Sequence, residues 1–232
     1  MHKVHNPRAV NLICDATFYG KRRDKLGTLV FKDSITKEVL MWKHIQSETI
    51  KDYKYLLSEL LALGYIINSI TIDGKRGLYR AFEDYHVQMC HFHQKRIIQR
   101  YITKRPKLQA SKDLQKIMQR LTFTNKTIFT KRLDTWYTVY KDFLAEETLN
   151  EETGEKRFKH AKLVSAYRSL RTNLPYLFTY KKHKHLSIHN TTNSLDGGVF
   201  SPIKMLIKVH RGLNKSLKLK MVDDYLVRDN KK

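Results

Sequence analysis

Two aspartates follow apolar runs at positions where a carboxylate is costly to bury. Asp15 follows Val-Asn-Leu-Ile-Cys, and Asp73 follows Ile-Asn-Ser-Ile-Thr-Ile. Aspartate is depleted in strands and expensive to bury unpaired. If the two strands are neighbours in one sheet, both carboxylates lie at one edge, where a divalent cation with oxygen ligands would relieve their repulsion. A simpler interpretation stays open: each aspartate ends its strand as a turn residue, which suits Asp73-Gly74.

A third aspartate is distinguished by its surroundings. Between Lys156 and Val222, Asp196 is the one acidic residue among 15 lysines and arginines. The N-cap candidates Thr192 to Ser194 would put Asp196 in the first turn of a helix. There the helix dipole could stabilise it by ~0.5 kcal/mol, or it could be a metal ligand amid groups that bind phosphate.

The segment Cys-His-Phe-His contains a Cys-x-x-His motif formed by Cys90 and His93, and it begins seventeen residues after Asp73. A structural zinc site needs four ligands, and only Cys14 could supply a second thiolate. No paired Cys-x-x-Cys exists. The alternative is a buried cysteine that closes a strand, followed by a histidine that caps the next helix. His93 could also orient a metal site or a phosphate.

The hydrophobic pattern changes character near residue 93. Alternating strand and helix signals precede that point, and helical spacing dominates after it, which predicts an α/β sheet with a helical insertion. Strands are expected at residues 10–16, 26–32, 38–44, 66–72 and 87–90. Helices are expected at 49–63, 75–85, 93–101, 108–121, 126–147 and 159–172, with a polar loop at 150–156 and a final helix from 192–194 past His210.

Composition narrows the partners. The chain has 232 residues, with 45 lysines and arginines against 22 acidic residues and a formal charge of +23. A charge of this size attracts polyanions, and nucleic acid is the leading partner because phosphate contacts release condensed counterions. No apolar run, amphipathic anchor or secretory signal favours a membrane. The two cysteines, with no secretory signal, favour reduced thiols in a cytoplasm.

Several basic residues are candidates for phosphate contacts. Lys204, Lys208, Arg211, Lys215 and Lys218 recur three or four apart and would form one stripe on a continuous helix. A basic loop just before Asp196 and a helix after Cys90 add further candidates, which are Lys181, Lys182, Lys184, Lys95, Arg96 and Arg100. A solvated helix face is the alternative explanation of these charges.

An aromatic cluster occurs in the expected helical insertion. Trp136, with Tyr137 and Tyr140, could stack on a flipped or flanking base. Packing within the insertion explains the same cluster.

Together these motifs resemble the Mutator-like group of bacterial insertion-sequence transposases. The resemblance covers residues 11–226 and consists of an aspartate at the first and fourth strands, Cys-x-x-His after the fifth, a lone tryptophan in a helical insertion and Thr-Thr-Asn before the last acid. It implies an RNase H-like mixed five-stranded sheet. The implied parts are a core over 9–105, an all-helical insertion over 106–186 and a last helix with a basic segment over 187–228.

The resemblance also implies a function. Asp15, Asp73 and Asp196 would hold two Mg²⁺ or Mn²⁺ ions for cutting and joining DNA in a homodimer or larger oligomer, in a prokaryotic cytoplasm. Two departures stand out: the family's third acid is usually glutamate, and about fourteen residues precede Asp15, too few for the usual DNA-reading domain. The alternatives are a truncated or inactive DNA-binding copy, an RNase H-like nuclease without strand transfer, and a ribosome-associated protein.

Overall fold

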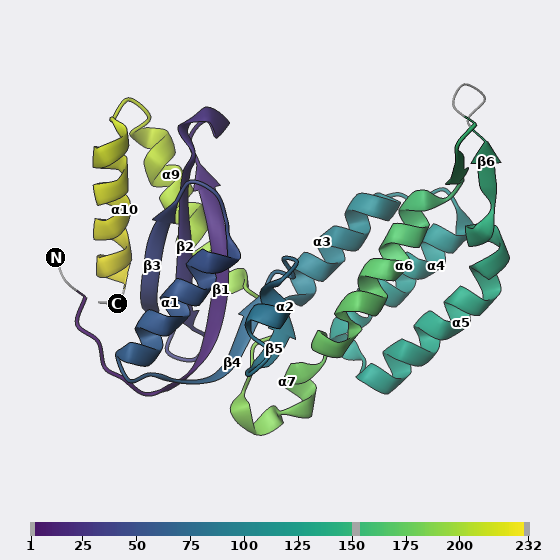
Figure 1. The fold of residues 1–232 in the computed structure, drawn as a ribbon, viewed down its shortest axis with the longest axis horizontal. Coiled ribbons are helices and arrows are strands. Elements are labelled where there is room, and N and C mark those ends of the chain that lie inside the picture. The colour runs from purple at the N-terminus through teal and green to yellow at the C-terminus, as the bar shows by residue number, and fades with distance from the viewer. Residues whose placement is uncertain (1–2, 150–153, 230–232) are drawn as a thin grey trace.

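The computed structural model describes residues 3–149 and 154–229. The chain is an α/β protein with a five-stranded mixed sheet in the order β3-β2-β1-β4-β5, flanked by helices (Figure 1). Strands β1, β2 and β3 are antiparallel neighbours, whereas β4 and β5 run parallel to β1. The predicted class and strand number are thus confirmed. The strand bounds are Ala9–Tyr19, Leu26–Asp33, Val39–Ile45, Ile66–Ile72 and His86–Met89.

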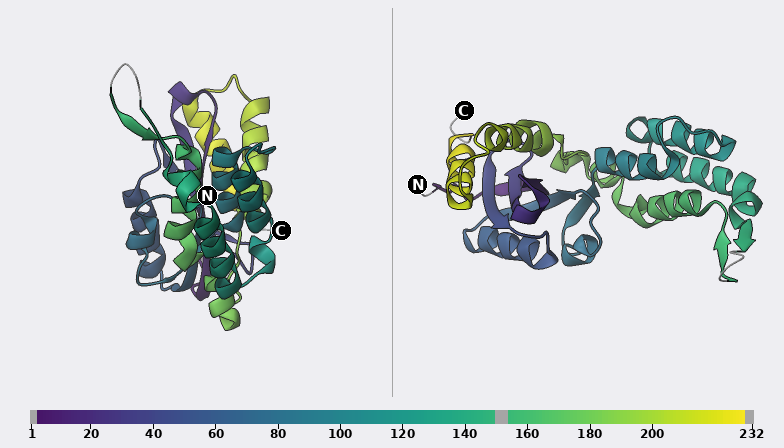
Figure 2. Two further views of the ribbon diagram at one scale, coloured as in Figure 1. Left: turned by 90° about the vertical axis from the view of Figure 1, so that its right-hand side faces the viewer. Right: turned by 90° about the horizontal axis from the view of Figure 1, so that it is seen from above.

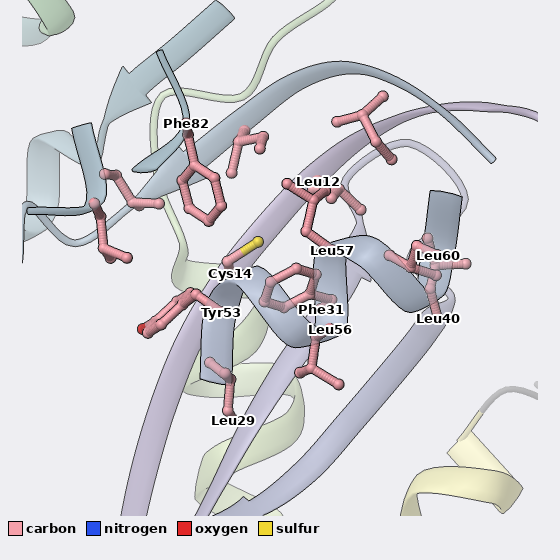
Figure 3. Close-up of a cluster of buried hydrophobic side chains, with 14 of the residues drawn as sticks. Leu12, Cys14, Leu29, Phe31, Leu40, Tyr53, Leu56, Leu57, Leu60 and Phe82 are labelled. Carbon is pink, nitrogen blue, oxygen red and sulfur yellow. The ribbon is translucent and has the colours of Figure 1, made fainter. Parts of the chain in front are cut away.

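Both faces of the sheet are covered, which explains why its strands are apolar at successive positions. On β1, Leu12 and Cys14 face one core and Ile13 faces another. The first core lies under α1 (Ile50–Ala62) and contains the side chains of Figure 3. The second lies under α9 (Ser201–Val209) and α10 (Lys215–Asp229), on the opposite side of the sheet (Figure 2, right).

Helix α1 begins and ends where local chemistry dictates. The Thr49 side chain accepts a hydrogen bond from the Asp52 backbone N–H, which caps the first turn. Leu56, Leu57 and Leu60 recur on the buried face. Gly64 follows with φ +90°, a conformation that stops the helix at little steric cost. The helix predicted over 49–63 is therefore confirmed to within one residue at each end.

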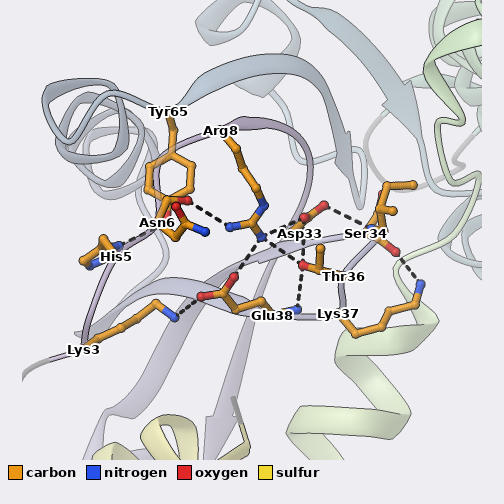
Figure 4. A network of polar contacts seen from close by, with 11 residues as sticks. Lys3, His5, Asn6, Arg8, Asp33, Ser34, Thr36, Lys37, Glu38 and Tyr65 are labelled. Atoms are coloured by element: carbon orange, nitrogen blue, oxygen red, sulfur yellow. Dashed lines mark hydrogen bonds and ion pairs between the residues drawn. The ribbon is translucent and has the colours of Figure 1, made fainter. Parts of the chain in front are cut away.

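A polar network fastens the segment before β1 to the turn between β2 and β3 (Figure 4). The Arg8 guanidinium donates to Asp33 at 3.1 Å and to Glu38 at 2.8 Å. Lys3 pairs with the same Glu38 at 2.6 Å. Because Asp33 is almost fully buried, this network compensates a carboxylate that would otherwise be costly to bury.

The helical part lies beyond β5, at the far side of the molecule from α10 (Figure 1). Its core joins Ile98, Leu114, Leu133, Trp136 and Leu170. The predicted boundary at residue 106 falls after the first of its helices, whereas the helical core already includes that helix. Its helices are α3 (His91–Ile102), α4 (Gln109–Gln119), α5 (Lys126–Ala145) and α6 (Ala161–Asn173).

Short elements connect these units. They are α2 (Leu78–Ala81), the hairpin of β6 (Glu147–Leu149) and β7 (Lys156–Phe158), α7 (Thr179–Lys182), α8 (Asn193–Leu195), the π-helix Asp196–Phe200, and 3₁₀ turns at Arg22–Asp24, Leu121–Phe123, Leu174–Tyr176 and Lys184–Leu186.

Three predictions about elements were wrong. Strand β1 runs to Tyr19, so Asp15 lies within the strand and not at its end. The strand is longer than predicted because its pairing with β2 continues to Tyr19, whereas its pairing with β4 stops at Ile13. The helix expected over 75–85 shortens to Leu78–Ala81, since Gly77 just before it adopts φ +86°. Of the loop expected over 150–156, residues 150–153 lie outside the described chain and Lys156 begins β7.

The last helix is also interrupted, contrary to the prediction. Helix α9 ends at Val209, and α10 begins at Lys215 after a turn in which the Asn214 side chain accepts from the Leu217 N–H. The chain reverses direction there (Figure 1). Lys204 and Lys208 therefore lie on a different helix from Lys215, and the single basic stripe does not form.

Asp223 on α10 provides a test of how this helix is held to the sheet. Its Oδ1 accepts from Trp42 Nε1 at 2.7 Å and from His44 Nε2 at 2.9 Å. Asp223→Ala removes both bonds and is expected to lower the free energy of unfolding by about 1–3 kcal/mol in urea titrations. The matched change at the exposed neighbour, Asp224→Ala, should stay within about 0.5 kcal/mol of the wild type. Equal stabilities of the two variants would contradict this role.

Candidate metal centre

The sheet register brings the first two aspartates together. Ile13 on β1 is opposite Thr71 on the parallel strand β4. Asp15 stands two residues further along β1, and Asp73 stands one residue past the end of β4, so both carboxylates lie near the carboxyl end of β4. Asp15 is on the same side of β1 as Ile13, which faces the core under α9. The adjacency expected from the two strand ends is consistent with this register.

Three ligand atoms converge at this edge. One atom each from Asp15, His93 and Asp196 lies within 4.8 Å of the others, and within residues 3–149 and 154–229 no other such group of His, Cys, Asp and Glu forms. His93 Nε2 is 4.0 Å from Asp15 Oδ2. The Asp196 Oδ2 atom is buried and has no hydrogen-bond partner among the described residues. A buried carboxylate oxygen without a donor fits a cation ligand.

Burial and like charge act together on Asp15. Its side chain is almost fully buried and accepts one hydrogen bond, from the Ala16 N–H at 2.8 Å. Burial raises the pKa of Asp15 well above its ordinary range, and the charges of Asp73 and Asp196 raise it further. A cation at this point would reverse the balance by favouring the charged form. The electrostatics of the site therefore fit a divalent ion.

Asp73 is placed as a turn residue and also lies close to Asp15. Its Oδ1 accepts from the Lys75 N–H at 2.9 Å, as a turn residue would. It is also close enough to Asp15 to raise that residue's pKa. Its carboxylate is not one of the three most closely grouped ligand atoms, where His93 stands instead.

The chain returns to the sheet along buried polar groups of the strands. Asn11 donates to the Leu186 carbonyl at 2.6 Å, and Thr71 donates to the His189 carbonyl at 2.8 Å. The His91 N–H donates to the Asn190 carbonyl at 2.8 Å. These bonds fix residues 186–190 across β1, β4 and the start of α3. The π-helix that starts at Asp196 follows six residues later, so its position is set by the sheet.

The Cys-x-x-His motif forms a hydrogen-bonded chain with Thr192. The Thr192 N–H and hydroxyl both donate to Cys90 Sγ, at 3.3 and 3.5 Å. Because the hydroxyl proton is used there, Thr192 Oγ1 accepts from His93 Nδ1 at 3.2 Å. That assignment leaves the Nε2 lone pair of His93 facing Asp15. Such an arrangement orients a metal-ligating histidine.

The zinc interpretation is not supported by these contacts. Cys14 packs in the core under α1 with Leu12 and Phe31, whereas Cys90 is bonded to Thr192. Burial raises the pKa of both thiols. Cys90 also does not close β5 as predicted: the strand ends at Met89, and Cys90 is the N-cap residue of α3.

A fourth carboxylate near the site was missed from the sequence. Glu48 precedes α1, accepts from Tyr53 Oη at 2.7 Å and lies 3.5 Å from Lys75 Nζ. Its charge contributes to raising the pKa of Asp15. The available signal was an acid three residues after the end of β3 and next to the N-cap Thr49. The sequence did not mark Glu48 as part of a site, because no second acid stands near it at a spacing typical of metal ligands.

The candidate phosphate-binding residues divide into two groups. Lys95 donates to Thr122 Oγ1 at 3.3 Å and Lys181 donates to the Thr124 carbonyl at 2.7 Å, so both hold the helical part together. Burial lowers the pKa of Lys95. Lys218 is half-buried and donates to the Arg211 carbonyl at 2.9 Å. The remaining predicted cations are exposed, and these are Arg96, Arg100, Lys182, Lys184, Lys204, Lys208, Arg211 and Lys215.

Trp136 is a packing residue. Its side chain is 4% exposed, and Nε1 donates to the Ala110 carbonyl at 2.9 Å. Tyr167 stacks on it at a centroid distance of 5.9 Å. The indole is therefore held inside the helical core, and in this conformation it cannot stack on a base.

Comparisons of the sequence with models of known protein families and with curated proteins found no match. Within the described residues, no helix combines the length and the apolar character that crossing a bilayer requires.

Asp15→Asn tests the electrostatics of the metal-free site. Because the pKa of Asp15 is higher in the folded chain than its ordinary value of 3.8, the folded wild type loses stability as pH rises from about that value toward the folded pKa. The asparagine side chain carries no charge, so we expect the metal-free variant to melt about 2–4 °C higher at neutral pH, for a gain on the order of 1 kcal/mol.

The gain should vanish in acid, where Asp15 is protonated in the wild type as well. Asp142→Asn, at an exposed site on α5, is the control and should not change the melting temperature. Mn²⁺ should raise the melting temperature of the wild type much more than that of the Asp15→Asn protein. If the Asp15→Asn protein melts below the wild type at neutral pH without metal, the charged Asp15 carboxylate does not destabilise the metal-free fold.

Thr192→Val tests the orientation of His93. Valine keeps the shape but removes the hydroxyl that accepts from Nδ1, so we expect Mn²⁺ affinity to fall about 10-fold or more. Titration of Mn²⁺ followed by melting temperature or calorimetry measures the change. Thr192→Ser should restore affinity, because it returns the hydroxyl. Unchanged Mn²⁺ affinity in a folded Thr192→Val protein would remove Thr192 from the site.

Proposed function

We propose that this chain is a metal-dependent enzyme that cuts phosphodiester bonds on an RNase H-like fold. The observation that carries the proposal is the convergence of Asp15, His93 and Asp196 at one sheet edge, with a buried, unpartnered oxygen on Asp196. Asp73 follows the end of β4 and is close enough to Asp15 to raise that residue's pKa. The mixed five-stranded sheet, with β2 and β3 antiparallel and β4 and β5 parallel to β1, is compatible with that fold.

More particularly, we propose the catalytic domain of a DNA transposase similar to the Mutator-like bacterial group. The Cys-x-x-His resemblance gains support because Cys90 and His93 are linked through Thr192 at the edge that carries Asp15. A helical insertion between β5 and Asp196, bearing one tryptophan, supports the same proposal. The charge of +23 supports a polyanionic substrate.

The residues present fit a divalent cation. Asp15, Asp196 and His93 would hold one ion, and Asp73 and Glu48 offer further oxygens from which a second could be held. A bound Mg²⁺ or Mn²⁺ supplies charge stabilisation at the phosphate and a lowered pKa of water. A nitrogen ligand favours Mn²⁺ over Mg²⁺, which prefers oxygen.

The Asp196 side chain is one methylene shorter than the glutamate usual in the family that the chain resembles, and the local backbone compensates for the difference. Asp196 begins a π-helix, Asp196–Phe200. This geometry is rare in proteins overall, but where it occurs it is often at a functional site. Gly197 follows it with open space where a Cβ would stand. The absence of side chains there lets a DNA backbone approach the carboxylate closely.

Nicking of a supercoiled plasmid tests the proposal. With Mg²⁺ or Mn²⁺ we expect cutting that EDTA abolishes and that Asp73→Ala or Asp196→Ala lowers by about 100-fold or more, because a metal ligand contributes several kcal/mol to the transition state. DNA binding should persist in both variants. The exposed control Asp142→Ala should cut like the wild type.

The products then separate the candidates. Joined strands in addition to nicks support a transposase, whereas nicks alone indicate a nuclease without strand transfer. No cutting, with tight salt-sensitive DNA binding retained, would overturn the catalytic proposal in favour of an inactive DNA-binding copy. Normal cutting by Asp73→Ala would contradict the carboxylate scheme.

A further inference from the structure

Helix α3 carries a cationic groove that starts at the metal centre. The groove has a volume of about 570 Å³ and begins at His93, continuing past Arg96, Arg100 and Lys104. His93, Arg96 and Arg100 recur three or four apart, so they share one face of the helix, and Lys104 follows two residues past the end of the helix. No acidic residue lines the groove. From His93 to Arg100 this helical face spans about 10 Å, enough for on the order of three nucleotides.

An exposed aromatic ring lies directly beside this face. Phe92 is 38% exposed, and its ring is 5.7 Å from that of His93, centroid to centroid. The Arg96 guanidinium lies over the same ring at 5.5 Å. An apolar ring at the surface next to a charged site and under a cation is not explained by core packing.

Phe92 also lines a second groove, which lies between α3 and α4 and has a volume of about 400 Å³. The floor is apolar, with Ile98 and Met118, and the amides of Gln99 and Gln119 stand among its lining. An apolar floor with amide groups suits the flat face and polar edge of a nucleobase. The volume is within the range of pockets that hold a small ligand.

We propose that this surface binds single-stranded DNA next to the scissile phosphate. One unpaired base stacks on Phe92, and Arg96, Arg100 and Lys104 contact the phosphates of the strand as it leaves the metal centre. The proposal rests on the proposed function for its substrate. Because bases in a duplex are stacked on one another, Phe92 discriminates for an unpaired strand.

Binding measured in EDTA tests the proposal without any cutting. The probes are a fluorescein-labelled single strand of about 12 nucleotides and a duplex of the same length. Phe92→Leu should raise the Kd for the single strand about fivefold or more and leave the Kd for the duplex within about twofold. Phe92→Trp should bind the single strand at least as tightly as the wild type.

The chain offers a matched aromatic control on the far face of the sheet. Tyr55 on α1 is 49% exposed and carries Lys43 over its ring at 4.7 Å, as Phe92 carries Arg96. Tyr55→Leu should change neither Kd. Arg100→Gln should weaken single-strand binding and make the dependence of log Kd on log salt shallower by ~0.7, whereas the exposed Lys54→Gln should not.

A Phe92→Leu protein that binds the single strand as the wild type does, or that loses the same factor on duplex, overturns the proposal. Loss of single-strand affinity alone supports it. Because the assay contains no metal, an inactive protein in the plasmid assay can still satisfy this test, and an active one can fail it. The two proposals therefore stand or fall separately.

Discussion

The repulsion among carboxylates at one buried sheet edge is the constraint on which the rest of this structure depends. Asp15 is almost fully buried beside Asp73 and Asp196, and burial and like charge both raise its pKa. A folded chain tolerates such a cluster only where a proton or a cation neutralises part of it. The strand register, the returning segment and the Cys90–Thr192–His93 chain all keep these groups from moving apart.

The returning segment shows how the fold resists that repulsion. Asn11, Ser69 and Thr71 are buried polar residues on β1 and β4, and Ser69 donates to Asn11 at 2.7 Å. Each is satisfied by the backbone of residues 186–190 or by a neighbouring strand. Removing one such partner leaves a buried polar group unpaired, at a cost of about 1–3 kcal/mol. The polar positions in the strands are therefore anchors for Asp196.

Local patterns predicted the sheet and the neighbouring aspartates, because strand ends and hydrophobic periodicity are properties of short segments. They did not predict that Asp15 lies inside a longer strand, since the extra pairing comes from β2. Glu48, the link from Thr192 to His93 and the interruption between α9 and α10 depend on contacts between distant segments. The choice between packing and base stacking for Trp136 likewise required its burial, which periodicity does not give.

Helix α3 belongs to two bodies at once. Its first turn carries His93 at the sheet edge, while Ile98 and Ile102 are part of the helical core with α4 and α6. A helix of 12 residues is about 18 Å long, so a tilt of about 6° moves one end by about 2 Å relative to the other. The helix is in effect a lever arm: a partner that binds the helical part and tilts α3 also changes the distance between the His93 imidazole and the Asp15 carboxylate.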